Sequence, residues 1–263
     1  MQGYIVTGTS RGLGLALVEE LLKDKFSTVV GIARTPVPSL IEKEHYHFLA
    51  ADLGKPAEIH AVIQRAQSLL GAGPFQSVTL INNAAVISPI AQVGHYPTQD
   101  LLQALHINIA APMLLCDAFI ASTFHQEPRL RILNISSGAA TTPYPGWGVY
   151  GSTKAALDHF TRHIMAEHQT DKKRPITAVS LYPGLLDTEM QNVIRQSHES
   201  DFPLKKRFVT LHQDAQLVSP SEAARHIIHY LNGPTFGTHV IVDIRDIALF
   251  ATDEQHHKNT HDL

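Results

Sequence analysis

The feature that most constrains the fold of this chain is a glycine-rich turn near its start. Residues 7–14 (TGTSRGLG) come directly after a short β-branched run, and beyond them Leu13, Ala16, Leu17 and Leu21 recur at helical spacing. Glycines let the backbone turn tightly and approach a ligand closely, and the unpaired N–H groups at a helix start attract phosphate. A strand, a glycine turn and a helix in this order therefore predict the first βα unit of a dinucleotide-binding fold.

The spacing of the glycines in this turn is unusual. Three residues separate Gly8 from Gly12 and one separates Gly12 from Gly14, which reverses the common one-then-two spacing. A glycine-rich turn can also be a tight turn without a ligand, so the strand before it and the helix after it carry the interpretation. The predicted cofactor-binding residues of the turn are Gly8, Ser10, Arg11, Gly12, Leu13 and Gly14.

The rest of the chain alternates short β-branched runs with longer stretches of helical periodicity. This alternation is typical of parallel strands joined by crossover helices. We predict a Rossmann-type, doubly wound α/β fold in which helices cover both faces of a seven-stranded parallel sheet. One domain is expected over residues 1–250, followed by a polar C-terminal tail at 251–263. The predicted strands are 4–7, 28–33, 46–50, 77–81, 131–135, 177–182 and 239–244, and further helices are predicted at 56–70, 98–124, 148–168 and 219–231.

Composition excludes several classes of partner and site. The net charge of −3 gives no electrostatic case for nucleic acid or membrane binding. No run of 18 apolar residues and no export signal is present, and the single cysteine, Cys116, favours a reducing compartment, so we expect a cytoplasmic protein. No metal is expected. His256, His257 and His261 lie in the polar tail, and His106 is expected to be a packed helix residue.

The residue that follows the second predicted strand indicates which dinucleotide is bound. An acidic residue about 20 positions beyond the glycines would accept the ribose hydroxyl of NAD. Arg34 stands 20 positions after Gly14, and no carboxylate lies beside it. Arg34 and Arg11 are suited to the 2'-phosphate of NADP, which favours NADPH/NADP as the cofactor. The alternative is that Arg34 is a solvated residue at the strand end.

A second constellation carries the predicted chemistry. Tyr150 and Lys154 are four residues apart in a helical stretch, and Ser137 follows the fifth predicted strand at the sheet edge where ligands bind. A free tyrosine has a pKa of about 10, so a nearby cation such as Lys154 is needed to make it an acid or base near neutrality. Alone, such a pair is common on amphipathic helices. In a chain that also has the glycine turn, this pair predicts proton transfer by Tyr150.

Together these motifs resemble the short-chain dehydrogenase/reductase family along nearly the whole chain. The resemblance rests on residues 7–14, Asn82 to Ala85, Asn108, the Ser137, Tyr150 and Lys154 set, and Pro183-Gly184. It implies a nicotinamide cofactor without metal, and a homodimer or homotetramer assembled through the helices after the fourth and fifth strands.

The implied catalytic residues are Ser137, Tyr150 and Lys154, with Asn108 holding a water that links Lys154 to solvent. The implied further cofactor contacts are Asp52 and Leu53 at the adenine, Asn83, Ala84 and Ala85, Pro183 and Gly184, Leu186 and Thr188 at the carboxamide, and Tyr150 and Lys154 themselves. The family usually has glycine at the position of Ala85.

Residues 145–150 (PGWGVY), 181–191 (LYPGLLDTEMQ) and 237–240 (GTHV) are similar to the sepiapterin reductase branch, which includes bacterial reducers of benzil and other vicinal diketones. This likeness implies a substrate with two adjacent carbonyls, either benzil or another diketone or a sepiapterin-like pterin side chain. Ser137, Trp147 and Tyr150 are the implied substrate contacts, with Trp147 giving a flat ring a surface or, alternatively, packing in a loop. Either Asp243 or Asp246 is implied as an anchor for a polar ring. Residues 192–217 are expected to form a lid whose apolar inner surface comes from Phe202, Leu204, Phe208 and Leu211.

The function that these patterns favour is NADPH-dependent reduction of a small-molecule carbonyl substrate, with hydride passing to a ketone carbon and Tyr150 protonating its oxygen. Two alternatives stay open. The same residues would serve an NAD(P)-dependent secondary alcohol dehydrogenase, and a catalytically silent dinucleotide-binding regulator would keep the glycine turn. The intact Ser137, Tyr150 and Lys154 set weighs against the regulator.

Overall fold

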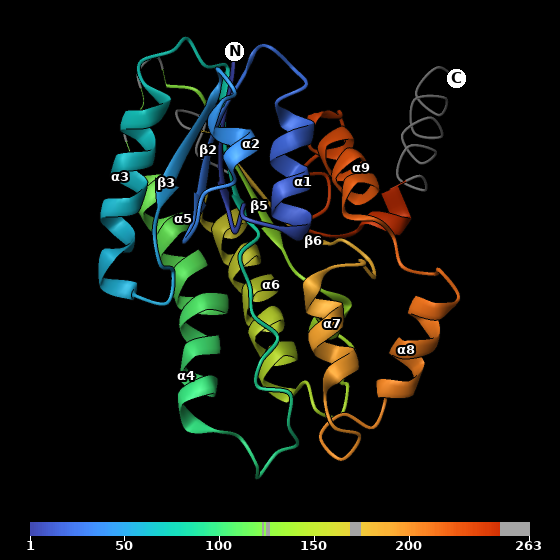
Figure 1. Ribbon diagram of the computed structural model, residues 1–263. Helices are drawn as coiled ribbons and strands as arrows, with labels where there is room; N and C mark the ends of the chain where they lie inside the picture. The colour runs from blue at the N-terminus through green and yellow to red at the C-terminus, as the bar shows by residue number, and fades with distance from the viewer. Residues whose placement is uncertain (123, 125–126, 169–174, 248–263) are drawn as a thin grey trace, which may run out of the picture.

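A seven-stranded parallel sheet forms the centre of the protein in a computed structural model that describes residues 1–122, 124, 127–168 and 175–247 (Figure 1). Its strand order is β3-β2-β1-β4-β5-β6-β7. The predicted tail at 251–263 lies outside the described residues. All seven predicted strands match the observed ones within two residues at each end. The strands are β1 (Gln2–Thr7), β2 (Ser27–Ala33), β3 (Tyr46–Ala50), β4 (Ser77–Asn82), β5 (Arg129–Ile135), β6 (Ile176–Tyr182) and β7 (Ile241–Asp243).

Each predicted helical stretch is helical in the structure, one of them with an interruption, and three further helices at 38–41, 189–196 and 205–213 were not predicted. The predicted helix 98–124 consists of α4 and α5 joined by a π-helical turn at His106–Ala110, and it ends at Ala121 because Ser122 adopts an extended backbone. Ser219 caps α9 as predicted, since its hydroxyl accepts a hydrogen bond from the Glu222 amide. The helices are α1 (Gly12–Leu21), α2 (Pro38–Ile41), α3 (Ile59–Leu70), α4 (Thr98–Leu105), α5 (Ala111–Ala121), α6 (Gly148–His168), α7 (Glu189–Gln196), α8 (Lys205–Gln213) and α9 (Pro220–Asn232).

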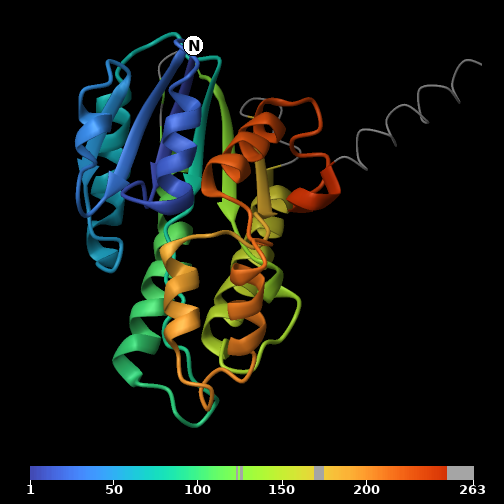
Figure 2. The same cartoon turned by 45° about the vertical axis from the view of Figure 1, so that its right-hand side comes forward.

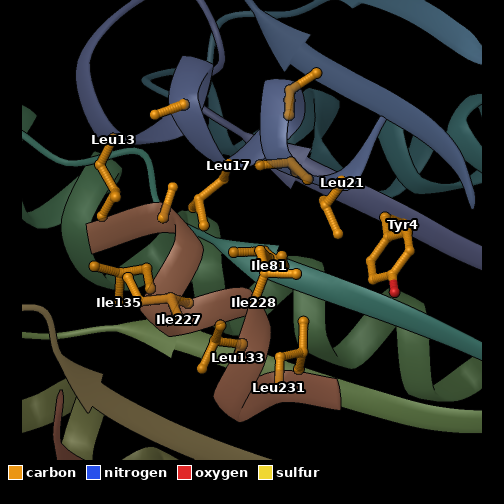
Figure 3. Packing of buried hydrophobic residues seen from close by; sticks show 14 of the residues in the cluster. Tyr4, Leu13, Leu17, Leu21, Ile81, Leu133, Ile135, Ile227, Ile228 and Leu231 are labelled. Carbon is orange, nitrogen blue, oxygen red and sulfur yellow. The ribbon is translucent and has the colours of Figure 1, made fainter. Parts of the chain in front are cut away.

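The sheet is buried on both faces, because successive side chains of a strand point to opposite sides. On β1, Tyr4 and Val6 join a cluster with α1 and α9, whereas Ile5 joins a cluster with α3 and α5 on the other face. Figure 3 shows the first cluster, in which Leu17 of α1 and Ile227 of α9 approach each other above the strands. The two apolar layers hold the helices against the sheet by removing hydrocarbon from water.

The strand order creates the place where a ligand can bind. The chain runs outward from β1 through β2 to β3 and then returns to β4 on the other side of β1. Where such an order reverses, the loops at the carboxyl ends of the strands diverge and leave a crevice. The glycine turn after β1 and the segment after β4 meet at this edge. Helices α7 and α8 lie beyond the same edge in both views of the molecule (Figure 2).

The helical stretch from α4 to α5 is unusually apolar. Among the described residues, Thr98–Ala121 is the one helical stretch that is long and apolar enough to cross a membrane, with a mean hydropathy of 1.6 over an 18-residue window. However, α5 packs against α3, and Leu115, Cys116 and Phe119 are buried in the core. His106 is exposed, so the prediction that it is packed is wrong for the single chain, because its position in the π-helical turn directs it away from the sheet layer.

The closest backbone approach in the glycine turn is at Gly14. A Cβ atom there would lie 2.2 Å from the Gly8 carbonyl oxygen, so the turn has no room for a side chain. We predict that Gly14→Ala lowers the free energy of unfolding by about 1 to 3 kcal/mol, the usual cost of overpacking. Gly138→Ala is the control, because nothing lies within 4 Å of a Cβ at that position. Urea denaturation of both variants measures the effect, and equal midpoints would contradict the prediction.

Candidate active site

A cavity of about 510 Å³ opens at the carboxyl edge of the sheet. It is lined by the glycine turn, by the ends of β2, β3, β4 and β5, by the start of α6, and by the segment from Pro183 into α7. Every predicted cofactor-binding and substrate-binding residue lines it, and so do the predicted catalytic residues except Asn108. Residues from most of the chain length are therefore brought together at one site.

The glycine turn is held in place from β4. The Thr7 hydroxyl accepts hydrogen bonds from the backbone amides of Asn83 and Ala84, both at 3.0 Å, and Asn83 Nδ2 donates to the Thr7 carbonyl at 2.9 Å. Gly8 and Gly12 adopt φ angles of +73° and +57°, which favour glycine. This network fixes the two strand ends at the switch point and shapes the turn.

The N-terminus of α1 faces this turn without a side-chain cap. Arg11 precedes the helix in an extended conformation, and no side chain accepts a hydrogen bond from the first-turn amides. Such amides carry partial positive charge and bind phosphate oxygens well. The residues present therefore fit the pyrophosphate of a dinucleotide.

Two arginines lie at the β2 end of the cavity. Arg34 and Arg11 both line it and are both exposed, and in the described part of the chain neither forms an ion pair with a carboxylate. Asp52 and Leu53 line the same end, where the Asp52 carboxylate accepts a hydrogen bond from the Gly54 amide at 3.0 Å. The two guanidinium groups are thus available to an anion.

Tyr150 and Lys154 lie on the buried face of α6, with side chains 7% and 3% exposed. Lys154 Nζ donates a hydrogen bond to the Ile135 carbonyl at 2.7 Å and lies 5.8 Å from the centre of the Tyr150 ring. Ser137 follows β5, and its hydroxyl accepts a hydrogen bond from the Ala139 amide at 3.2 Å. The phenol, the ammonium group and the hydroxyl converge at the cavity, as the spacing predicts.

Burial changes the acidity of both α6 groups. Burial raises the pKa of Tyr150, and hydrogen bonding to the Ser137 hydroxyl partly offsets the rise. Burial lowers the pKa of Lys154 to about 8, against the opposing effect of the negative charge of Asp158. Before a ligand binds, the site therefore favours a neutral phenol next to a lysine that loses its proton near pH 8.

Asn108 does not reach the cavity. Its side chain exchanges two hydrogen bonds with the backbone of Val86, at 2.9 and 2.8 Å, and donates to the Thr153 hydroxyl at 3.2 Å. These contacts tie the segment after β4 to α6 through the π-helical turn. Its predicted link to a water remains a prediction, and the side-chain amide is already occupied.

The substrate end of the cavity differs from the expectation. Trp147 is only 6% exposed, and its ring stacks on Phe202 with centroids 4.9 Å apart and an interplanar angle of 7°. Phe208 packs on the same ring system. The prediction that Phe202, Leu204, Phe208 and Leu211 form the inner surface over the substrate is wrong, because they do not line the cavity and pack in a cluster with Trp147, which does line it.

The apolar wall comes instead from α7. Met190, Val193 and Ile194 line the cavity at positions three and four residues apart. This spacing, directly after the Pro183-Gly184 segment, is a sequence signal that could have identified the wall.

Neither Asp243 nor Asp246 lines the cavity, so the prediction of an acidic anchor is wrong for the described residues. Asp243 instead accepts hydrogen bonds from its neighbour Arg245, because the chain turns away in a short helical turn directly after β7. Sequence reasoning also missed Asp158, a buried acidic residue one turn beyond Lys154. Among the described residues, no group of three or more histidine, cysteine or acidic side chains is placed to hold a metal ion.

Known proteins with similar sequences and structures identify the family of this chain. The sequence profile of the short chain dehydrogenase family matches residues 3–199. A benzil reductase of Bacillus cereus, which forms (S)-benzoin, is 34% identical over 241 residues, covering 90% of this chain and 96% of that protein. Mouse sepiapterin reductase is 29% identical over 258 residues, covering 92% and 96%. The crystal structure of the KRED1-Pglu enzyme superimposes with a TM-score of 0.78 at 29% identity, covering 90% and 98%.

The two relatives and the solved structure match over 90% or more of this chain, and the family profile covers the glycine turn, Ser137, Tyr150 and Lys154. The chain belongs to the short-chain dehydrogenase/reductase family of oxidoreductases, on the branch that contains the benzil and sepiapterin reductases.

Proposed function

We propose that this protein is an NADPH-dependent carbonyl reductase that acts on vicinal dicarbonyls such as benzil. The observation that carries the proposal is the convergence of Tyr150, Lys154 and Ser137 in one cavity with the glycine turn. Benzil reductases and sepiapterin reductases among the relatives support a substrate with two adjacent carbonyl groups.

When bound, the cofactor supplies a hydride for the carbonyl carbon, and the residues of this chain supply the proton and the positioning. Tyr150 donates the proton of its hydroxyl to the carbonyl oxygen as negative charge develops there. Ser137 hydrogen-bonds the same oxygen and orients the carbonyl toward the phenol. The Lys154 ammonium stabilises the phenolate that remains on Tyr150 and binds the nicotinamide ribose. The carbonyl thus gains one hydride and one proton and becomes an alcohol.

The shape and chemistry of the cavity support an apolar, ring-bearing substrate. Met190, Val193 and Ile194 line the cavity with hydrocarbon from α7, and Ser137 and Tyr150 line the same cavity. Apolar walls with a few convergent polar groups are typical of small-molecule sites. If a phenyl ring of the substrate packed on α7, the carbonyl group bonded to that ring would face Tyr150.

The arginine pair supports NADPH over NADH. A guanidinium group binds a phosphate strongly through charge-assisted hydrogen bonds, whereas an uncharged ribose hydroxyl gains little from it. Arg34 and Arg11 lie at the same end of the cavity as Asp52 and Leu53. A 2'-phosphate placed between the two arginines would neutralise both.

We also propose that the protein assembles as a homodimer or homotetramer through the helices after β4 and β5, which are α4, α5 and α6. Leu102 and Met113 are 41% and 39% exposed on the apolar helical stretch of α4 and α5, and a second copy of the chain would cover them. Sedimentation measurements should give the mass of at least two chains, and the mass of one chain would exclude the proposal.

Tyr150→Phe removes the proposed proton donor and keeps the ring. Benzil reduction, followed as loss of reduced-nicotinamide absorbance, should fall by about 10² to 10⁴-fold because positioned proton transfer is worth that much. NADPH binding, measured by calorimetry, should persist. Tyr230→Phe makes the same change at a buried tyrosine of α9, outside the cavity, and should leave turnover intact. Full turnover in Tyr150→Phe would refute the assignment, and NADPH binding without turnover of any carbonyl in the wild type would favour the silent regulator.

Arg34→Ala tests the cofactor assignment. The NADPH affinity should fall by about 10 to 100-fold, because a hydrogen bond to a charged group contributes about 1.5 to 3 kcal/mol, whereas the NADH affinity should change little. Arg65→Ala removes an exposed arginine of α3 that lies outside the cavity and serves as the control. Titration calorimetry with both cofactors gives the ratio. An unchanged preference, or a wild-type preference for NADH, would contradict the assignment and favour the NAD-dependent alcohol dehydrogenase.

A further inference from the structure

A buried carboxylate lies on the same face of α6 as the two proposed catalytic residues. Tyr150, Lys154 and Asp158 follow one another at intervals of four residues, which places them on one side of the helix. Asp158 is only 4% exposed and does not line the cavity. Burial of a carboxylate costs free energy unless other groups compensate its charge. The groups that contact Asp158 therefore indicate its role.

Asp158 is hydrogen-bonded to β6 by both of its oxygens. The Ser180 hydroxyl donates to Oδ1 at 2.6 Å, and the Tyr182 hydroxyl donates to Oδ2. Ser180 and Tyr182 are two residues apart on the strand, so their side chains share one face of the sheet. Tyr182 directly precedes the Pro183-Gly184 segment that lines the cavity. The carboxylate therefore connects the Lys154 helix to the strand that leads into the cavity wall.

Two basic residues of α6 lie four positions from this carboxylate, Lys154 before it and Arg162 after it; Lys154 is buried, whereas Arg162 is exposed. Lys154 hydrogen-bonds the Ile135 carbonyl on β5, and within the described chain it forms no direct ion pair with Asp158. The two groups interact through the low-dielectric interior, where charges are screened much less than in water.

We propose that Asp158 is a positioning residue for the carbonyl reduction proposed above, acting through Lys154: its buried carboxylate keeps Lys154 in the ammonium form beside Tyr150. The proposal rests on the proposed function, because it assigns Asp158 a part in that reaction. Asp158 touches neither the cavity nor a reacting atom, and no motif in the family resemblance includes it.

The environment of Lys154 and Asp158 determines in which direction removal of the carboxylate shifts the pKa of Lys154. Burial lowers the pKa of Lys154, and Asp158 is the charged group that opposes the fall. On the neighbouring strand, burial and the Asp158 carboxylate both raise the pKa of Tyr182, so this phenol stays a neutral donor; Arg162 of α6 and Asp243 of β7 act on it more weakly and in opposite directions. Tyr150 is a neutral phenol whose pKa burial raises. Removal of the Asp158 charge should therefore lower the pKa of Lys154 below about 8.

The consequence is a pH-dependent loss of activity. Lys154 stabilises the Tyr150 phenolate only while it is protonated, so activity should decline as the pH rises through the pKa of Lys154. In Asp158→Asn this alkaline decline should begin at lower pH. A merely structural defect would instead lower activity by a similar factor at every pH.

The first experiment is the pH profile of kcat/KM for benzil with NADPH. At about pH 6, Asp158→Asn should retain activity within about threefold of the wild type, and at about pH 8.5 it should be about tenfold lower, the factor for a one-unit fall in pKa. Asp158→Glu should restore part of the profile. Ser180→Ala and Tyr182→Phe each remove a hydrogen bond but keep the charge, so their alkaline limbs should stay near that of the wild type. A loss in Asp158→Asn that is the same at every pH would overturn the proposal.

A second variant covers the case in which Asp158→Asn does not fold. The combination of Asp158→Leu, Ser180→Ala and Tyr182→Phe removes the charge without leaving buried hydroxyls unpartnered, which limits the cost to stability. It should show the same shift of the alkaline limb. An alkaline limb at the wild-type position in this variant would also overturn the proposal.

A third measurement separates this proposal from the proposed function. In protein that carries isotope-labelled lysine, NMR titration follows the Lys154 side chain without substrate, and Lys154→Met identifies its signal. The Lys154 pKa should be lower in Asp158→Asn than in the wild type. Failure of the wild type to reduce benzil would count against the proposed function alone, whereas an unchanged Lys154 pKa would refute the role of Asp158 even in an active enzyme.

Discussion

The proposed chemistry depends on an ammonium group held inside the protein. Lys154 is almost fully buried, and its direct hydrogen-bond partner among the described residues is the Ile135 carbonyl. Burial of a cation is unfavourable, and it lowers the pKa of this lysine to about 8. The protein gains a positive charge that is screened little by water and lies beside Tyr150, the one tyrosine among the described residues that line the cavity. Such a charge stabilises a phenolate far better than an exposed lysine does.

The fold supplies this arrangement through the register of three elements. Helix α6 places Tyr150, Lys154 and Asp158 on one face, β5 ends beside Lys154 and leads to Ser137, and β6 supplies the hydroxyls that hold Asp158. All three elements meet at the carboxyl edge of the sheet, where the glycine turn lies on the other side of the strand-order reversal. The proposed proton donor and the glycine turn proposed to bind phosphate are thus positioned by separate parts of one sheet.

Much of the site could be predicted because its signals are local. The glycines of the first turn, the spacing of Tyr150 and Lys154, and Arg34 after β2 each depend on a few neighbouring residues, and each lines the cavity. The packing of Trp147 could not be predicted in the same way, since it depends on Phe202 and Phe208 from another segment. The positions of the acidic residues at the end of β7 could not be predicted either, because they depend on how the chain turns there. The position of Asp158 on the same helix face could have been predicted, because it continues the four-residue spacing of Tyr150 and Lys154. Its burial could not, because the hydroxyls that hydrogen-bond its carboxylate come from a distant strand.

The measurement that tests the central claim most directly is a crystal structure of the protein with NADP bound. The account predicts the nicotinamide ring beside the Tyr150 hydroxyl, the Lys154 ammonium within hydrogen-bond distance of the ribose, and the 2'-phosphate between Arg11 and Arg34. A dinucleotide bound elsewhere, or a Tyr150 hydroxyl that faces away from the nicotinamide, would contradict it.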